Sequence, residues 1–241
     1  MDGVSRGFGL LLAAASTALV AACGSSKSAA PEASPLPSLG PVTAAAPVTA
    51  PPTTDSDRLR DQLLTSTNLP PNFTALPTRA DVAADGQASP TDPAECAKVL
   101  TPLAAQRPGS LAKASVGYSG PNFSSIDIDA ASYANDAVAS AFSEVQATLR
   151  GCAHYSGTDA TDISVDYRVG GLTAPQAGDA ATAFQVRTSS DGLTLHSSVA
   201  IVQVGSTLVQ VGVTAPEPVE AGVLSDLTAA QVRRLQGVPG P

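Results

Sequence analysis

Acid–base and nucleophilic chemistry would have to come from very few side chains in this sequence. Only two of its 241 residues are histidines, His154 and His196, and its three cysteines form no C-x-x-C motif. The motifs G-x-S-x-G, G-x-x-x-x-G-K-[ST], G-x-G-x-x-G and H-E-x-x-H do not occur. The sequence therefore predicts a protein that is not an enzyme. A hydrolase that combines His196 with a nearby serine and a carboxylate is kept as an alternative.

Metal binding could come only from carboxylates. Asp127 and Asp129 stand two apart on one predicted strand face, and Asp159, Asp162 and Asp166 follow further along the chain. Oxygen ligands gathered on one face could hold Ca²⁺, whereas the histidines and cysteines lack the spacing of a zinc site. A solvated face in an acidic protein explains the same carboxylates. We therefore predict no metal and no cofactor.

Cys23 is the most informative of the three cysteines. It ends the segment Val20-Ala21-Ala22-Cys23, directly after an apolar run of about 15 residues, which is short for a membrane-spanning helix. The segment resembles the signal of bacterial lipoproteins. This resemblance implies that residues 1–22 are a signal peptide, that Cys23 carries a diacylglycerol thioether, and that the protein is anchored to the outer face of the cell membrane. A plain secretory signal is the alternative.

The other two cysteines, Cys96 and Cys152, form an even pair in an exported chain, so a disulfide is expected. A disulfide between them would lower the conformational entropy of the unfolded chain, which destabilises the unfolded state by roughly 4 kcal/mol. Two free buried thiols are the alternative.

Composition excludes some partners. The formal net charge is −8, which argues against nucleic-acid binding because that rests on Lys and Arg neutralising phosphates. Aromatic residues make up only 4% of the chain and Trp is absent, so the core must consist of Val, Leu, Ile and Ala.

The chain divides into a tether and one domain. Residues 23–57 are rich in Pro, Ala and Thr and contain few large apolar side chains, which predicts a disordered tether. Residues 58–236 are long enough for one domain with its own core, and residues 237–241 are a short tail.

Four helices are expected in this domain. The first spans 57–65 with Asp57 as its cap, and the second begins at Asp92-Pro93-Ala94-Glu95, with Asp as cap and Pro at the first position. A long amphipathic helix is predicted over 131–150, and a closing helix over 224–235. His154 is expected in a loop after the third helix.

Strands dominate the remaining sequence. Alternating patterns predict strands over 112–119, 124–129, 163–169, 181–188, 193–201 and 208–213, with turns at Asp191-Gly192 and Gly205-Ser206. The last three strands should form an antiparallel meander. The predicted fold class is α+β, with a twisted antiparallel sheet packed by helices.

A sheet covered on one side has a second face that could bind a ligand. On the meander we expect that face to carry polar side chains, as a weak candidate for ligand binding or simply a solvated surface. They are Thr194, His196, Ser198, Gln203 and Gln210.

Several segments resemble one known family. They are the Leu63-Leu64 helix, Leu69-Pro70-Pro71-Asn72-Phe73, Asp92-Pro93-Ala94-Glu95-Cys96-Ala97, Ala141-Phe142 before Cys152, and the Val-rich meander. Together they resemble the extracellular sensor domain of a mycobacterial receptor serine/threonine kinase, which also occurs on stand-alone lipoproteins. The resemblance covers roughly 58–236 and implies an α/β sandwich with a ligand cleft. It carries over no ligand residue.

The leading hypothesis is thus a membrane-anchored lipoprotein of a cell envelope with a non-enzymatic ligand-binding or sensing domain. Its partners would be the membrane, through Cys23, and an unknown small molecule, lipid or protein. A carrier of envelope lipids or glycolipids is the first alternative, and it would need a deep apolar cavity.

Overall fold

The computed structural model describes residues 34–77, 90–159 and 161–238. Its contacts separate Met1–Pro35 from a compact unit, Leu36–Pro241, which is the folded domain. The predicted signal peptide and Cys23 lie outside the described residues, as does the end of the predicted tail. No helix among the described residues combines the length and the apolar character that crossing a membrane requires.

The domain is built on one antiparallel sheet, in which nine strands of the described residues follow the order β1-β3-β4-β9-β8-β7-β6-β5-β2. Consecutive long strands pair with each other except β4 and β5, which residues 133–153 connect, and β9 pairs with β4 as well as with β8. Their bounds are β1 Thr74–Ala75, β2 Thr91–Asp92, β3 Ala112–Ser119, β4 Ser125–Ser132, β5 His154–Thr158, β6 Ser164–Gly171, β7 Ala180–Ser190, β8 Leu193–Val204 and β9 Thr207–Ala215.

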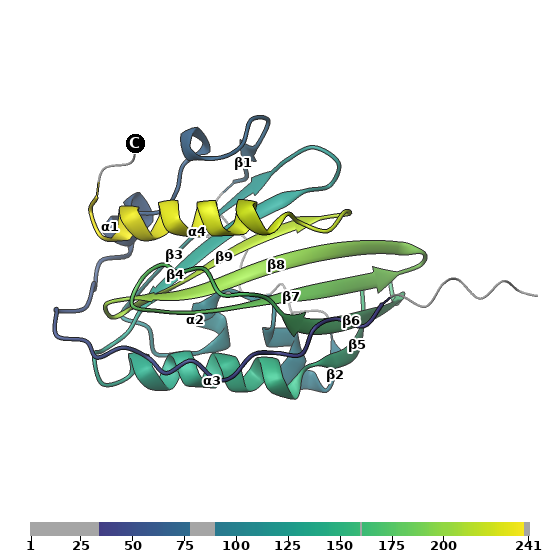
Figure 1. Cartoon of the computed structure of the whole chain (residues 1–241), viewed down its shortest axis with the longest axis horizontal. Helices are drawn as coiled ribbons and strands as arrows, with labels where there is room; N and C mark the ends of the chain where they lie inside the picture. The colour runs from purple at the N-terminus through teal and green to yellow at the C-terminus, as the bar shows by residue number, and fades with distance from the viewer. Residues whose placement is uncertain (1–33, 78–89, 160, 239–241) are drawn as a thin grey trace, which may run out of the picture. The chain divides into compact units, whose positions relative to one another are not determined.

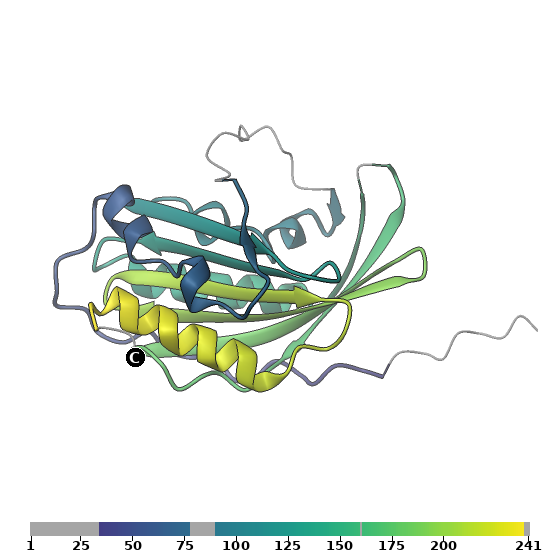
Figure 2. The ribbon, with the colours of Figure 1, turned by 90° about the horizontal axis from the view of Figure 1, so that it is seen from above.

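Helices cover both faces of the sheet. Helices α1 (Ser56–Asp61) and α4 (Ala221–Leu235) lie on one face, while α3 (Val138–Gly151), α2 (Leu103–Gln106) and the 3-10 helix η3 (Ala94–Lys98) lie on the other (Figures 1 and 2). A second 3-10 turn, η1 (Ser66–Asn68), follows α1. The predicted α+β class with a helix-packed antiparallel sheet is confirmed.

Two separate cores result from this layering. On one face Val202 and Val211 of the sheet pack with Leu224 of α4, and on the other Phe184 and Ile201 pack in the same core as Phe142 of α3. The expectation that one sheet face stays uncovered is therefore wrong. In the central strands, the residues that point to one face of the sheet and those that point to the other are both apolar, as strands buried on both faces require.

The predicted meander is present, with β7, β8 and β9 paired through the turns at Asp191-Gly192 and Gly205. The third helix starts at Val138 rather than at 131, because 130–132 still pair with β3 and β9 as part of β4. The first helix is capped by Asp55 and not by Asp57. The Asp55 carboxylate accepts hydrogen bonds from the backbone N–H of Asp57 (2.9 Å) and of Arg58 (3.2 Å).

The helix expected to begin at Asp92 is the largest local error. Asp92 belongs to β2 and pairs with Ser156 of β5, so its backbone is extended and its side chain caps no helix. The chain then forms only the 3-10 helix η3 followed by the single turn of α2. Within η3, Cys96 is bonded to Cys152 just after α3, with a Cα–Cα distance of 5.5 Å.

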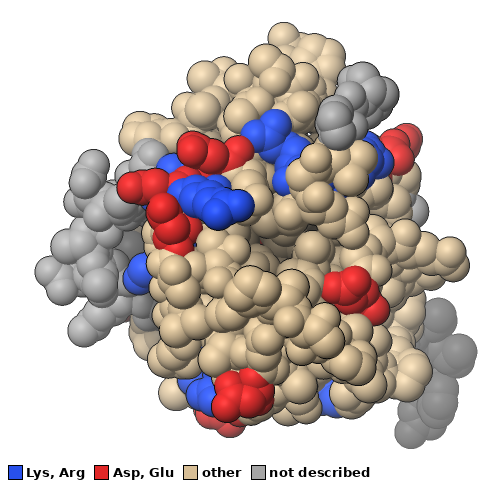
Figure 3. Space-filling view, turned by 90° about the vertical axis from the view of Figure 1, so that its left-hand side faces the viewer, with Lys and Arg blue, Asp and Glu red and all other residues tan. Residues whose placement is uncertain are grey.

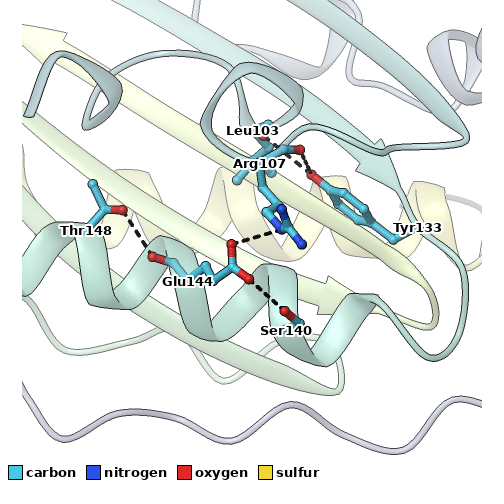
Figure 4. A network of polar contacts seen from close by, with 6 residues as sticks. All are labelled: Leu103, Arg107, Tyr133, Ser140, Glu144 and Thr148. Carbon is cyan, nitrogen blue, oxygen red and sulfur yellow. Dashed lines mark hydrogen bonds and ion pairs between the residues drawn. The ribbon is translucent and has the colours of Figure 1, made fainter. Parts of the chain in front are cut away.

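Polar contacts hold α2 against α3 (Figure 4). The guanidinium of Arg107, which ends α2, pairs with the Glu144 carboxylate at 3.0 Å, and Ser140 donates to the same carboxylate at 2.7 Å. The Tyr133 hydroxyl donates to the Arg107 carbonyl at 2.9 Å. An ion pair this exposed contributes at most about 1 kcal/mol, so the buried tyrosine is the stronger part of this link.

The predicted tether is corrected over much of its length. Residues 36–50, which we call the strap, run along α3 as an extended segment and contact the domain (Figure 1). Prolines do forbid helix here, as expected, but an extended chain can also lie in a groove when its backbone finds hydrogen-bond partners.

Candidate ligand-binding face

The predicted binding residues separate into two groups. In β8, Thr194, His196 and Ser198 share one face, the face that also carries Ala200 and Val202 beneath α4. Gln203 and Gln210 lie on the other face with Ile201, so their placement beside Thr194 is wrong. The alternation of a strand puts residue 203 with 199 and 201, not with 194 and 196.

His196 belongs to a row of four basic or imidazole side chains that crosses four strands. His154 of β5 pairs with Arg168 of β6, Arg168 with Arg187 of β7, and Arg187 with His196. Directly paired residues of antiparallel strands lie on the same face with Cβ atoms roughly 5 Å apart. His154 is thus in a strand, not in the loop that we expected.

A second row runs beside the first. Ser156, Asp166, Ser189 and Thr194 are paired in the same order, and the Ser189 and Thr194 hydroxyls lie 3.1 Å apart. We call the two rows together the polar face. It consists of His154, Ser156, Asp166, Arg168, Arg187, Ser189, Thr194 and His196.

Among the described residues, no helix covers the polar face, because α4 stops short of it. Helix α4 packs on the other half of β8, and the ends of β7 and β8 near residues 190–193 project past it (Figure 1). His154 and Arg168 are exposed, and Arg187, Thr194 and His196 are half-buried. The alternation of strands β6 and β7 signals their outward residues, but only the strand register aligns them with His196.

Asp166 is the acidic centre of this face. Its Oδ1 atom lies 2.6 Å from His154 Nε2, and its Oδ2 accepts a hydrogen bond of 3.0 Å from Arg168 Nε. Partial desolvation raises the pKa of Asp166, but the hydrogen bonds from His154 and Arg168 together outweigh it and leave that pKa below its ordinary value. Asp166 therefore stays ionised and orients both neighbours.

Three effects act on the pKa of His196. Desolvation in the sheet lowers the pKa of His196, the positive charge of Arg187 lowers it further, and the Glu217 carboxylate raises it in part. His196 makes no hydrogen bond to a serine or a carboxylate within the described residues, so the hydrolase alternative finds no geometric support. His154 and Asp166 form a pair, but no nucleophile is bonded to it there.

The structure does not gather the candidate calcium ligands. Asp159 accepts hydrogen bonds from Thr161 and Ile163 within its own loop, and Asp166 belongs to the polar face. The residues described contain no group of three or more side chains from His, Cys, Asp and Glu that could hold a metal.

Asp129 has a structural role instead. It is 7% exposed, and its carboxylate accepts the Leu103 backbone N–H at 2.7 Å and the Gln210 amide at 3.0 Å, which fixes the start of α2 on the sheet. Burial raises the pKa of Asp129 to about 7, against the effect of the hydrogen bonds from Leu103 and Gln210.

Two hollows in the described surface are small. One of about 290 Å³ lies between α1 and the segment 104–113, at the end of the domain shown in Figure 3, where charged side chains of both signs gather around uncharged surface. Another, of about 10 Å³, lies beside Gly40 and Gln146. Sites for drug-sized ligands measure about 300–1,000 Å³, so neither suits a diacyl lipid, and the carrier alternative gains no support.

Comparison with known proteins supports the fold. No protein-family model and no curated protein matches the chain. The extracellular domain of PknH from Mycobacterium tuberculosis is similar in structure, with a TM-score of 0.58 and 15% identity over 77% of this chain and 98% of that domain. The predicted resemblance to a mycobacterial sensor domain is thus confirmed as a likeness of fold.

An uncharacterised Mycobacterium smegmatis protein, an ortholog of Rv0999, was also found. It is 15% identical over 69% of this chain and 92% of its own. Its TM-score of 0.35 is too low to support a shared fold.

Replacing Asp129 by Asn should change how stability depends on pH. The native carboxyl keeps its proton up to pH about 7, whereas the unfolded one loses it near 3.8. The native state therefore binds more protons in this range, and the contribution of Asp129 falls as pH rises from about 4 to about 7. In urea unfolding, Asp129→Asn should gain about 2 to 4 kcal/mol over the wild type between pH 5 and pH 8. An unchanged difference between the two proteins would contradict this account.

The imidazole of His196 should titrate below pH 6.5, as measured by NMR. Arg187→Gln should raise its pKa by removing a positive charge, and Glu217→Gln should lower it by removing a negative one. The control is Glu220→Gln, which removes the same charge from an exposed position further along the loop. Equal effects of the two glutamate variants would show that Glu217 has no specific effect on the pKa of His196.

Proposed function

We propose that this chain is a lipoprotein, anchored through acylated Cys23 to the outer face of the cell membrane, whose domain is a non-enzymatic binding or sensing module. The segment Val20-Ala21-Ala22-Cys23 supports the anchor. The fold shared with the extracellular domain of the PknH kinase supports an extracytoplasmic position and carries the sensing proposal. The Cys96–Cys152 disulfide fits an oxidising compartment.

The ligand site in this proposal is the polar face. It presents the guanidinium of Arg168, the hydroxyl groups of Ser189 and Thr194, and the imidazole of His196 on one rigid surface. Such donors suit a small polar ligand with phosphate or carboxylate oxygens, because guanidinium groups match these acceptors geometrically.

The net charge of the polar face, which changes with pH, should determine how tightly a ligand binds. With neutral His196, Arg168 and Arg187 are offset by Asp166 and Glu217, so the face has little net charge and binding rests on hydrogen bonds. Protonation of His196 at lower pH adds positive charge without removing a donor. The site should therefore bind anions more tightly in acid.

The anchor would limit how far the domain can stand from the membrane. Leu36 packs against Gly170 at the β6 edge, where a Cβ on the glycine would lie 2.5 Å from the Leu36 Cβ. The roughly 13 residues between Cys23 and Leu36 can span at most about 45 Å.

Acylation at Cys23 is tested by phase partition. The wild-type chain produced in a bacterium that makes lipoproteins should enter the detergent phase of Triton X-114, and intact mass should include a diacylglycerol group. Cys23→Ser should leave the protein in the aqueous phase, because two acyl chains supply most of the membrane affinity. Ser26→Ala, as a control, should behave like the wild type. A wild-type protein with a bare thiol or an uncleaved leader would overturn the anchor.

Ligand binding at the polar face is tested with inorganic phosphate and citrate as probes. At about 100 times the dissociation constant, a ligand should add roughly 2.7 kcal/mol of stability, which thermal unfolding detects. This gain in stability should be larger at pH 5.5 than at pH 8. In Arg168→Gln, the affinity for the ligand should fall at least tenfold. Lys113→Gln removes a positive charge from β3, far along the sheet, and should change nothing. An equal loss in both variants would mean that only net charge matters and would reject the site.

A further inference from the structure

The strap is held by its backbone at regular intervals. Backbone carbonyls of strap residues accept hydrogen bonds from Gly171 N–H (2.8 Å), the Arg150 guanidinium, the Gln146 amide (2.9 Å) and the Gln203 amide (2.9 Å). These acceptors are Pro37, Gly40, Thr43 and Ala46, every third residue. A polyproline II helix has three residues per turn, so this spacing fits a proline-containing extended peptide lying with one edge against the domain.

Two buried glutamines make the central contacts. Gln203 is 0% exposed and Gln146 is 3% exposed, and each carboxamide pairs with both the N–H and the C=O of one strap residue. The Thr43 N–H donates to Gln146 Oε1 and the Ala46 N–H to Gln203 Oε1, both at 2.8 Å. A carboxamide used in this way recognises a backbone and not a side chain.

The glutamines depend on the strap. The Nε2 atoms of Gln146 and Gln203 also donate to the carbonyls of Phe142 and Gly205, but among the described residues their Oε1 atoms accept only from the strap. Without an occupant, two buried acceptors would lose their partners, which is costly in a protein interior. The groove between α3 and the sheet is therefore built to hold an extended backbone.

Side chains of the strap add a size limit. Leu39, Ala45 and Val48 pack on the core beneath, while Val42 is 54% exposed and the hollow beside Gly40 is only about 10 Å³. Small and medium apolar residues fit the inward positions, and the outward positions are unrestricted.

We propose that this groove is a binding site for extended, proline-containing peptide segments with small residues, and that the strap occupies it in cis as a displaceable ligand. The occupant in trans is such a segment of another protein. The linked strap competes at high effective concentration, so only a peptide held close by or bound tightly displaces it. Release would lengthen the link from Cys23, from about 45 Å for the residues before Leu36 to about 110 Å for those before Asp55.

The test uses the chain from residue 23 with Cys23→Ser and a protease site inserted between Thr53 and Thr54, in the segment that joins the strap to α1. A fluorescent peptide of residues 36–50 is then added. Uncut protein should bind it weakly, and cut protein should exchange its strap for it with at least tenfold higher affinity. A cut protein that keeps its strap and excludes the peptide, or that unfolds, would overturn the proposal.

Substitution identifies the groove. Gln146→Met and Gln203→Met keep the side-chain length but remove the carboxamide, and each should weaken peptide binding at least tenfold in the cut protein. The matched control is Gln231→Met, because Gln231 is equally buried and pairs with the backbone of Gln62 and Leu64 on the other sheet face. Equal loss in all three variants would place the effect in general stability and reject the groove.

Hydrogen exchange on the uncut chain gives a second, independent answer. If the strap opens by itself, the N–H groups of Thr43 and Ala46 should exchange at least a hundredfold faster than that of Ile201 in β8. Equal rates would show that the strap leaves only when the whole domain unfolds and would overturn the proposal. A strap-exchanged dimer of the cut protein would do so too, because it assigns the groove to a second copy of this chain.

Discussion

Buried carboxamides that pair with backbone are the interaction on which this structure depends. Gln146, Gln203 and Gln231 each accept a backbone N–H and donate to a backbone carbonyl of a segment with no partner in the sheet. Losing such a partner costs about 1–3 kcal/mol for each orphaned group, so these three residues both require and position the strap and the end of α1. The core contains few aromatic residues, and these directional hydrogen bonds fix the position of the bound segments more specifically than apolar packing does.

The position of the helices then decides which part of the sheet can meet a ligand. Residues near the middle of the long strands are apolar on both faces and covered on both. Towards the 190–193 turn, the outward residues become His196, Thr194 and their neighbours in β5 to β7, and no helix of the described residues covers them. The polar face is thus a consequence of strands that are longer than the helices packed on them.

Period-two alternation and turn residues were enough to predict the antiparallel meander, because each strand there is long and its turns carry residues suited to positive φ, such as Gly192 and Gly205. The row from His154 to His196 could not be predicted, because it depends on the register of four strands, one of which is short and follows a helix directly. The strap was mistaken for free tether for a similar reason. Its prolines indicate that it is extended, but its hydrogen-bond partners, Gln146 and Gln203, lie 103 and 157 residues further along the chain.

The polar face, as the proposed ligand site, asks less of its geometry than catalysis would. Its side chains stand on a partly solvated sheet, where water screens their charges. Catalysis by imidazole needs a substrate atom held against a nucleophile and a base, but His196 contacts neither a serine nor a carboxylate within the described residues. Hydrogen bonding to a polar ligand needs only donors at fixed spacing, which paired strands provide. Arg187 and Glu217 act on the pKa of His196 with opposite sign, so an anion bound beside His196 would raise that pKa, and proton uptake and anion binding would reinforce each other.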